Sequence, residues 1–222
     1  MKTEQSIYSE SLGWIKKTDQ HLGAIAQLVF LFGNRDLLKK QNLVDDVQKV
    51  YPKAQLVGCS TSGEICQEEV LANNIICTAV WFEKTSVEIA VEPIGSMEDS
   101  FSIGEKLAEK LDKENLVHIM ILSEGLNING SELTKGLNHQ LHDRIPVTGG
   151  LAGDQANFVE TVIVHNKAGK KNLVLAIGFY GGNIRVGYGS MGGWDSFGVD
   201  RMITKSTGNI LYELDGHPAL EL

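Results

Sequence analysis

Two short segments of almost unbroken apolar sequence constrain the fold of this chain more than any other feature. Residues 24–32 (AIAQLVFLF) are interrupted only by Gln27 and are followed by Gly33. Residues 116–122 (LVHIMIL) are followed by a Ser-Glu-Gly turn. Runs of this length are too short to span a membrane and are typical of strands buried on both faces of a sheet. The chain is therefore expected to build its core around buried strands.

Helical patterns alternate with these strands through the first two-thirds of the chain. Apolar residues recur at helical spacing in residues 34–51, where Asn34 is expected to cap the helix and Pro52 to end it, and again in 98–113 and 131–141. Further β-rich runs are residues 55–58, 145–148, and 75–82 with 87–93, the last two expected to form a hairpin. After residue 154 short strands are expected at 158–165, 172–178, 184–189 and 202–204.

This order of elements predicts a mixed α/β (α+β) fold with helices layered over mixed sheets. Buried strands alternate with helices first, and an antiparallel meander follows. The sequence of 222 residues shows no internal repeat, low-complexity tract or linker, which favours one compact unit.

Charge and cysteine content exclude several classes of function. Acidic residues (28) outnumber lysine and arginine (20), and the basic residues form no stripe, so nucleic acid and anionic membrane surfaces are not expected partners. The three cysteines have neither disulfide-framework nor zinc-site spacing. The first ten residues lack the apolar core of a signal peptide, so a cytoplasmic location is expected.

The segment GCSTSGE (residues 58–64) follows one predicted buried strand and is the first candidate site. Small hydroxyl residues between glycines leave backbone N–H groups free to face a ligand, which makes Cys59, Ser60, Thr61 and Ser62 candidate ligand contacts. The same pattern also suits a tight structural turn. Cys59 is interpreted as a buried, inert thiol rather than a nucleophile, because no base can be named beside it.

The segment TGGLAGD (residues 148–154) is the second candidate. It matches neither the dinucleotide nor the Walker pattern, but Gly149, Gly150 and Gly153 could let the backbone approach a small ligand, and Asp154 could accept from an amine. A glycine corner in which Asp154 bonds its own backbone is the alternative. Glu124 ends a third buried strand, so the three loops are expected to share one pocket.

No metal site is predicted from the histidines. His139 and His142 share a helix face without a carboxylate placed to complete a site, and His118 in its apolar strand is interpreted as a buried structural histidine. Any haem would need an axial ligand that the sequence does not single out.

Taken together, these segments resemble the FIST family of sensory domains. The likeness rests on residues 57–65 (VGCSTSGEI), on 146–154 (PVTGGLAGD), on the early strand at 28–32, and on the Gly193-Trp194…Gly198 segment. Thr148 departs from the small or aliphatic residue expected there. Residues 204–222 resemble the junction between the amino-terminal and carboxyl-terminal FIST regions.

The resemblance implies a FIST N-type sensory domain over residues 1–200 and the truncated beginning of a FIST C-type region over 201–222. It implies a non-enzymatic input module of bacterial signal transduction that binds a small ligand such as an amino acid. Its expected partners are a histidine kinase, a chemoreceptor or a cyclic-dinucleotide enzyme, and no cofactor is expected. Three rivals remain open: a haem-based nitric oxide sensor, a hydrolase using Cys59 or Ser60, and a protein-interaction module.

Overall fold

The computed structural model divides into two compact units, residues 1–187 and 188–222. The larger unit contains two main sheets, and the smaller unit contains a three-stranded sheet. The residues described are 1–142, 144–189, 191–192, 195–208 and 210–221.

The first main sheet has six strands in the order β11-β4-β3-β7-β1-β2. Only β3 and β4 run parallel; the other neighbours are antiparallel. The strand β3 forms from the apolar run but begins at residue 28, because Gln27 instead bonds the backbone of Phe82 through its side chain. The strands are β1 (Lys2–Ser9), β2 (Gly13–Lys16), β3 (Leu28–Gly33), β4 (Gln55–Ser60), β7 (Ile75–Trp81) and β11 (Ile163–His165).

The second main sheet has four strands in the order β10-β9-β12-β8. The pair β9 and β10 is parallel, and β12 lies antiparallel between β9 and β8. A separate small hairpin is made by β5 (Glu64–Cys66) and β6 (Glu69–Leu71). The strands of the four-stranded sheet are β8 (Ser86–Pro93), β9 (Leu116–Ser123), β10 (Val147–Leu151) and β12 (Leu173–Tyr180).

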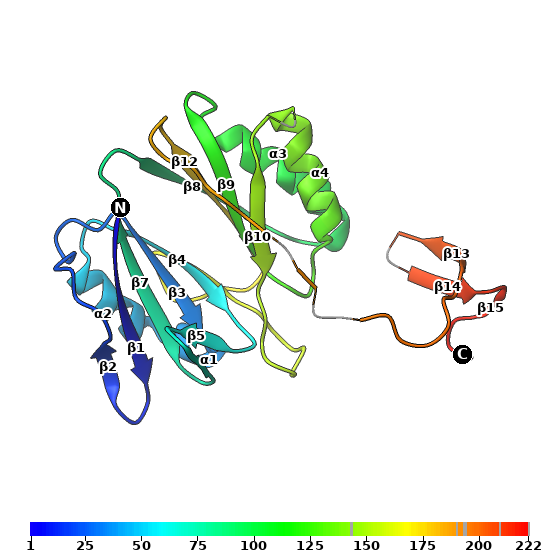
Figure 1. Cartoon of the computed structure of the whole chain (residues 1–222), viewed down its shortest axis with the longest axis horizontal. Helices are drawn as coiled ribbons and strands as arrows, with labels where there is room; N and C mark the ends of the chain where they lie inside the picture. The colour runs from blue at the N-terminus through cyan, green and yellow to red at the C-terminus, as the bar shows by residue number, and fades with distance from the viewer. Residues whose placement is uncertain (143, 190, 193–194, 209, 222) are drawn as a thin grey trace. The chain divides into compact units, whose positions relative to one another are not determined.

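The larger unit is built in layers, with the two sheets packed face to face and helices on their outer sides (Figure 1). Side chains from both sheets form the central core, including Val57 from β4 and Ile177 from β12. Helices α1 (Arg35–Leu38) and α2 (Gln41–Val50) cover the six-stranded sheet, whereas α3 (Ser100–Lys110) and α4 (Gly130–Leu141) cover the four-stranded one. The mixed α/β class with helices over mixed sheets is confirmed.

The predicted helix over residues 34–51 is two helices. Asn34 does cap the first one, since its side-chain oxygen accepts from the N–H groups of Asp36 (2.9 Å) and Leu37 (3.2 Å). Leu38 and Leu43 would lie roughly 140° apart around one continuous helix. The break between α1 and α2 lets both leucines be buried.

The other helix ends also differ from the predicted ones. A 3-10 turn, η1 (Met97–Asp99), precedes α3, so the α-helix is shorter than residues 98–113. The cap of α4 is Asn129, whose side chain accepts from two backbone N–H groups, so the helix begins at Gly130, one residue before the predicted start.

The predicted hairpin of residues 75–82 and 87–93 is wrong. The first run becomes β7 in the six-stranded sheet, and the second becomes β8 in the four-stranded sheet. Both edges of β7 are taken by β1 and β3, so β8 has no free edge to join and pairs with β12 instead.

The predicted meander is confined to the smaller unit. There β13 (Ile203–Thr207), β14 (Ile210–Leu214) and β15 (His217–Pro218) pair in order. Residues 158–165 and 172–178 instead supply β11 and β12 to different sheets, and no strand forms at residues 184–189. Asp215 joins the ends of the meander by accepting from the Met202 N–H (2.8 Å) and pairing with Arg201 (3.3 Å).

Within the described ranges, no helix combines the length and the apolar character needed to cross a bilayer.

Candidate functional site

The carboxyl ends of β4 and β10 meet directly. The Gly153 N–H donates to the Ser60 carbonyl oxygen (2.9 Å), and the Ser62 hydroxyl donates to the Gln155 carbonyl oxygen (3.5 Å). A Cβ on Gly153 would stand 2.4 Å from the Ser62 hydroxyl oxygen and 3.1 Å from the Ser62 backbone nitrogen, so a larger residue would require the Ser62 side chain to turn and its backbone to shift slightly. The ends of the GCSTSGE and TGGLAGD segments therefore lie side by side, as expected for loops that follow buried strands.

The loop after β9, which carries Glu124, reaches the same rim through contacts with Thr161. The Ala152 N–H donates to the carbonyl oxygen of Ser123 (2.7 Å), at the end of β9. The Thr161 hydroxyl donates to Glu124 (3.4 Å) and accepts from the Gly125 N–H (2.9 Å). We call this meeting of the loops after β4, β9 and β10 the three-loop rim.

Asp154 is the most heavily bonded side chain of the rim. Its carboxylate is 4% exposed and accepts from the N–H groups of Phe158 (3.0 Å), Val159 (2.8 Å) and Glu160 (3.0 Å). Burial alone would raise the pKa of Asp154, but these three donors and the nearby Arg35 outweigh it and lower the pKa. Asp154 is thus a carboxylate that holds its own loop, the alternative that the sequence left open.

Ser60, Glu124 and the two exposed hydroxyl residues have different roles at the rim. Ser60 is fully buried and accepts from the Val162 N–H (3.0 Å) through its hydroxyl. Glu124 is also buried and accepts from the Leu126 N–H (3.2 Å) and the Asn127 N–H. Thr61 is half-buried and Ser62 is exposed, so these two can reach a ligand without rearrangement.

Gly149 and Gly150 lie away from the rim. Both are inside β10, an edge strand, where they pair with Ile121 and Leu122 of β9. Both residues are exposed, and they form part of the edge of the sheet rather than a loop around a ligand.

Three residues at the rim escaped the sequence analysis: Thr161, described above, Arg35 and Glu64. Arg35 follows the Asn34 cap at the end of β3, and its guanidinium lies 3.5 Å from the Asp154 carboxylate. Glu64 is 2% exposed and accepts from the Thr61 hydroxyl (2.9 Å); burial raises its pKa. Arg35 could have been found, because β3 is parallel to β4 and their carboxyl ends share an edge.

Cys59 lies in the core between the sheets and not on the rim. It is 6% exposed, and burial raises the pKa of its thiol to about 12. A thiol of this kind is protonated at neutral pH and is a poor nucleophile.

The burial of the three cysteines predicts slow thiol chemistry. Cys59, Cys66 and Cys77 are free and buried, so we expect the native protein to react with a thiol-specific disulfide reagent far more slowly than the guanidinium-denatured protein. The measurement is release of the coloured thiol product under both conditions. Rapid native labelling mapped to Cys59 would contradict its placement and revive the hydrolase hypothesis.

The histidines remain separate from the rim. His139 lies 2.9 Å from the carboxylate of Glu105 in α3, a partner that the sequence analysis did not identify. His118 forms a hydrogen bond with Thr148 (2.8 Å) between β9 and β10. Among the residues that the structure describes, no group of three or more metal-binding side chains gathers. Gly193 and Trp194 of the predicted GW segment lie outside the described residues.

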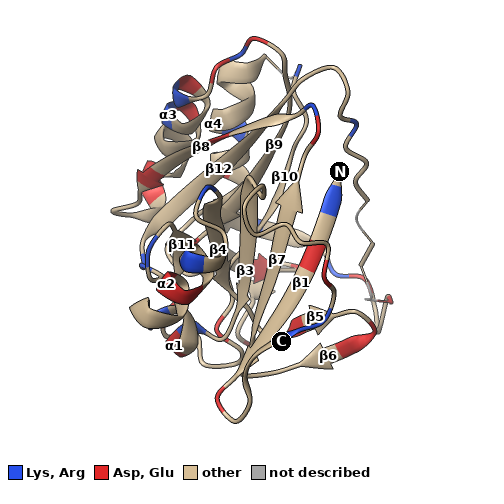
Figure 2. Ribbon diagram, turned by 90° about the vertical axis from the view of Figure 1, so that its left-hand side faces the viewer, with Lys and Arg blue, Asp and Glu red and all other residues tan. Residues whose placement is uncertain are grey.

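Basic and acidic residues are interspersed on the face shown in Figure 2, in keeping with the excess of acidic residues in the chain. Nothing in this distribution resembles the basic stripe that nucleic-acid binding needs.

The layered sheets and the three-loop rim define a mixed α/β domain with a polar junction at the strand ends. The FIST N domain family matches residues 27–217, most of the chain, and the chain belongs to this family of signal-transduction sensory domains. The family resemblance drawn from the sequence is confirmed.

A curated relative extends beyond the region shared with this chain. It is the "Uncharacterized protein MJ1623" of Methanocaldococcus jannaschii, 22% identical over an alignment that covers 91% of this chain and 41% of the relative. This chain therefore spans about two fifths of the relative's length. The expected bacterial signalling system stays a prediction, as does the division at residue 200.

Proposed function

We propose that this chain is the cytoplasmic input module of a signalling protein and that it binds a small zwitterionic metabolite, an amino acid or a close analogue, at the three-loop rim. The observation that carries the proposal is the convergence of three loops from separate strands on one cluster of charged and hydroxyl groups. The output partner is a histidine kinase, a chemoreceptor or a cyclic-dinucleotide enzyme.

The chemistry of the rim fits both ends of such a ligand. Arg35 and the Ser62 hydroxyl supply donors for a carboxylate, and an ammonium group would have to compete with the present donors of Glu64 and Asp154. The Ser123 hydroxyl is buried at the rim with no hydrogen-bond partner in the described part of the chain. A buried polar group in that state costs about 1–3 kcal/mol, which a bound water or ligand atom would offset.

The loop that Asp154 holds is the element that ligand would shift. Phe158 and Val159 are 76% and 73% exposed, and Phe158 has a left-handed φ of 52°. A ligand that competed for Arg35 or Asp154 would change the balance between two arrangements of this loop. Such differential binding is what a sensor requires.

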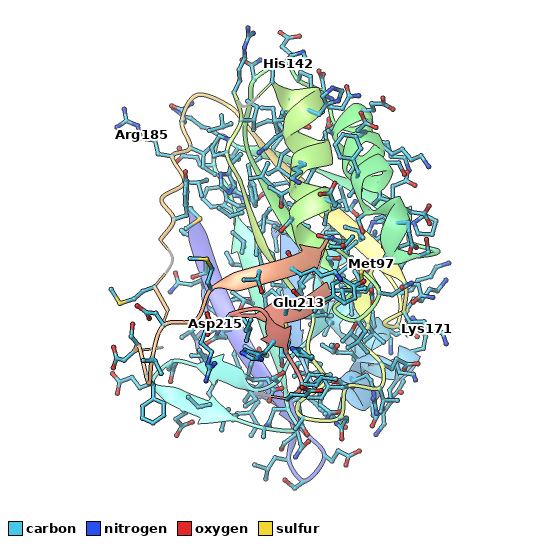
Figure 3. The ribbon with its side chains drawn as sticks, turned by 90° about the vertical axis from the view of Figure 1, so that its right-hand side faces the viewer. Met97, His142, Lys171, Arg185, Glu213 and Asp215 are labelled. Atoms are coloured by element: carbon cyan, nitrogen blue, oxygen red, sulfur yellow. The ribbon has the colours of Figure 1, made fainter. Side chains whose placement is uncertain are left out.

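Titration calorimetry of the full chain against amino acids and their deaminated carboxylates tests the proposal. We expect one amino acid class to bind saturably and Arg35→Gln to weaken that binding by roughly tenfold or more, because a charge-assisted hydrogen bond is lost. Arg185→Gln is the matched control, since Arg185 is exposed and points away from the ribbon in Figure 3.

The outcomes separate binding from folding. A circular dichroism melt of each variant shows whether Arg35→Gln is folded, and Ser62→Ala at an exposed position gives a second, milder variant. No binding by folded wild-type protein, or equal binding by the Arg35 and Arg185 variants, would contradict a ligand at the rim.

A further inference from the structure

A hollow lies on the opposite side of the six-stranded sheet from the central core, between the β1–β2 hairpin and α2. It has a volume of about 350 Å³ and is lined by Ser6, Trp14, Lys16, Asp46, Val47, Val50, Tyr51 and Cys77. That volume lies at the lower end of the range of small-molecule sites. None of these residues belongs to the three-loop rim.

The hollow exists because small side chains meet in one row of the sheet. Lys16, Ser6 and Cys77 are direct cross-strand neighbours on β2, β1 and β7 and form the floor. The wall is the carboxyl-terminal half of α2, where Val50 is 52% exposed. Serine and cysteine leave space that a larger pair would fill.

Most of the surface that faces the hollow is apolar. Trp14 is half-buried and contacts Tyr8, with ring centroids 5.3 Å apart, and the Val47 and Tyr51 side chains are buried against the sheet. A ligand that covered Val50 and the open face of Trp14 would remove their apolar surface from water. Each Å² removed would favour binding by roughly 25 cal/mol. A flat, apolar ring suits this surface.

The acidic groups near the hollow already have partners. Glu4 is 1% exposed beside the floor and accepts from the Tyr51 hydroxyl (2.8 Å) and from the backbone N–H groups of Gln20 (2.9 Å) and Leu22 (3.2 Å). Asp46 at the wall pairs with Lys49 (3.0 Å). These carboxylates are poor candidates to hold a cationic ligand.

Lys16 and Trp14 both have donor capacity left at the hollow, and the Ser6 hydroxyl can donate as well as accept. Lys16 pairs with Asp19 (2.9 Å) and stands 4.0 Å from Glu4, which leaves part of a three-donor ammonium group for another acceptor. The indole N–H of Trp14 is buried without an acceptor among the described residues. A ligand that fits the hollow must therefore bring acceptor oxygens.

We propose that this hollow binds a small, flat aromatic molecule that carries one carboxylate, with its ring against Trp14 and Val50 and its carboxylate toward Lys16. This site does not depend on the three-loop rim, and its ligand class differs from the metabolite proposed there.

Calorimetric titration of the full chain with indole-3-acetate and with uncharged indole tests this site. We expect indole-3-acetate to bind the wild type more tightly than indole does, and Lys16→Gln to weaken indole-3-acetate binding by roughly tenfold while leaving indole unchanged. Lys17→Gln is the matched control, because Lys17 is exposed and does not line the hollow.

Two further variants keep the result interpretable. Val50→Glu adds a repelling charge at an exposed position and is expected to abolish indole-3-acetate binding even if Lys16→Gln fails to fold. Arg35→Gln should not alter it, which distinguishes this hollow from the rim. The proposal is overturned if folded wild type does not bind indole-3-acetate, if the Lys16 and Lys17 variants bind it equally, or if Val50→Glu binds it normally.

Discussion

Replacing Gly136 with alanine is expected to destabilise the protein by about 2–3 kcal/mol, although alanine normally favours a helix over glycine. A Cβ on Gly136 of α4 would stand 2.0 Å from the Phe101 carbonyl oxygen of α3, and one on Gly104 would stand 2.3 Å from the Leu133 carbonyl oxygen. The two helices cross at these glycines, so the added methyl group must push their backbones apart. Urea denaturation followed by circular dichroism measures the change.

The same helix provides the control. Gly130 is the first residue of α4, and a Cβ there would meet only the Leu151 side chain at 4.0 Å. Gly130→Ala should change stability by no more than about 0.5 kcal/mol. Equal effects at the two positions would show that the helices do not cross as closely as the structure has them.

Asp154→Asn is expected to destabilise the protein by about 2–3 kcal/mol and to loosen the loop over residues 154–160. The asparagine keeps one acceptor oxygen but loses the charge that faces Arg35 and three backbone N–H groups. Hydrogen bonds to a charged, buried group contribute about 1.5–3 kcal/mol each. Denaturation gives the stability, and hydrogen exchange of the Phe158, Val159 and Glu160 amides reports on the loop.

The effect of Asp154 should depend on pH in a defined direction. Its pKa is lowered in the folded protein, so the carboxylate stabilises the fold above the usual aspartate pKa of about 4, and this stabilisation is lost as the pH falls through the folded-state pKa. The difference between wild type and Asp154→Asn should therefore shrink in acid. Asp36→Asn is the control: Asp36 also pairs with Arg35 but is 66% exposed, and its removal should cost less than about 1 kcal/mol.

The sequence predicted those parts of the fold that depend on local pattern. The apolar runs became β3 and β9, each flanked by two strands in its sheet, and Asn34 caps a helix through its own side chain. Both signals are contained within a few residues, so no distant partner was needed to interpret them.

The pairing of the strands could not be predicted from the sequence, because a strand can pair with any of several strands that are distant in the chain. A hairpin was predicted for residues 75–82 and 87–93 because a short connection joins them. In the structure, β7 instead lies between β1 and β3, which come from much earlier in the chain. The meander failed for the same reason: β11 pairs with β4, more than 100 residues before it. An alternating pattern indicates which face of a strand is buried, but it does not indicate which strands lie beside it.

The meeting of the three loops was predicted in outline. The sequence analysis grouped these loops because each follows a buried strand, but β4 and β10 lie in different sheets, so the meeting of Ser60 and Gly153 depends on how the two sheets pack. Gly149 and Gly150 were misassigned to a loop because β10 continues to Leu151. No sequence signal indicated Thr161, because it lies in an irregular segment and joins the rim through its contacts with Glu124 and Gly125.

The interleaving of the two sheets has a consequence for biosynthesis. The six-stranded sheet receives β11 only after most of the four-stranded sheet has been made, and β12, which separates β9 from β8, is made after that. The six-stranded sheet is complete only after about His165 has left the ribosome, and the four-stranded sheet only after about Tyr180. The nascent chain must therefore wait with the apolar inner faces of both sheets uncovered, a period in which chaperones would bind it most strongly.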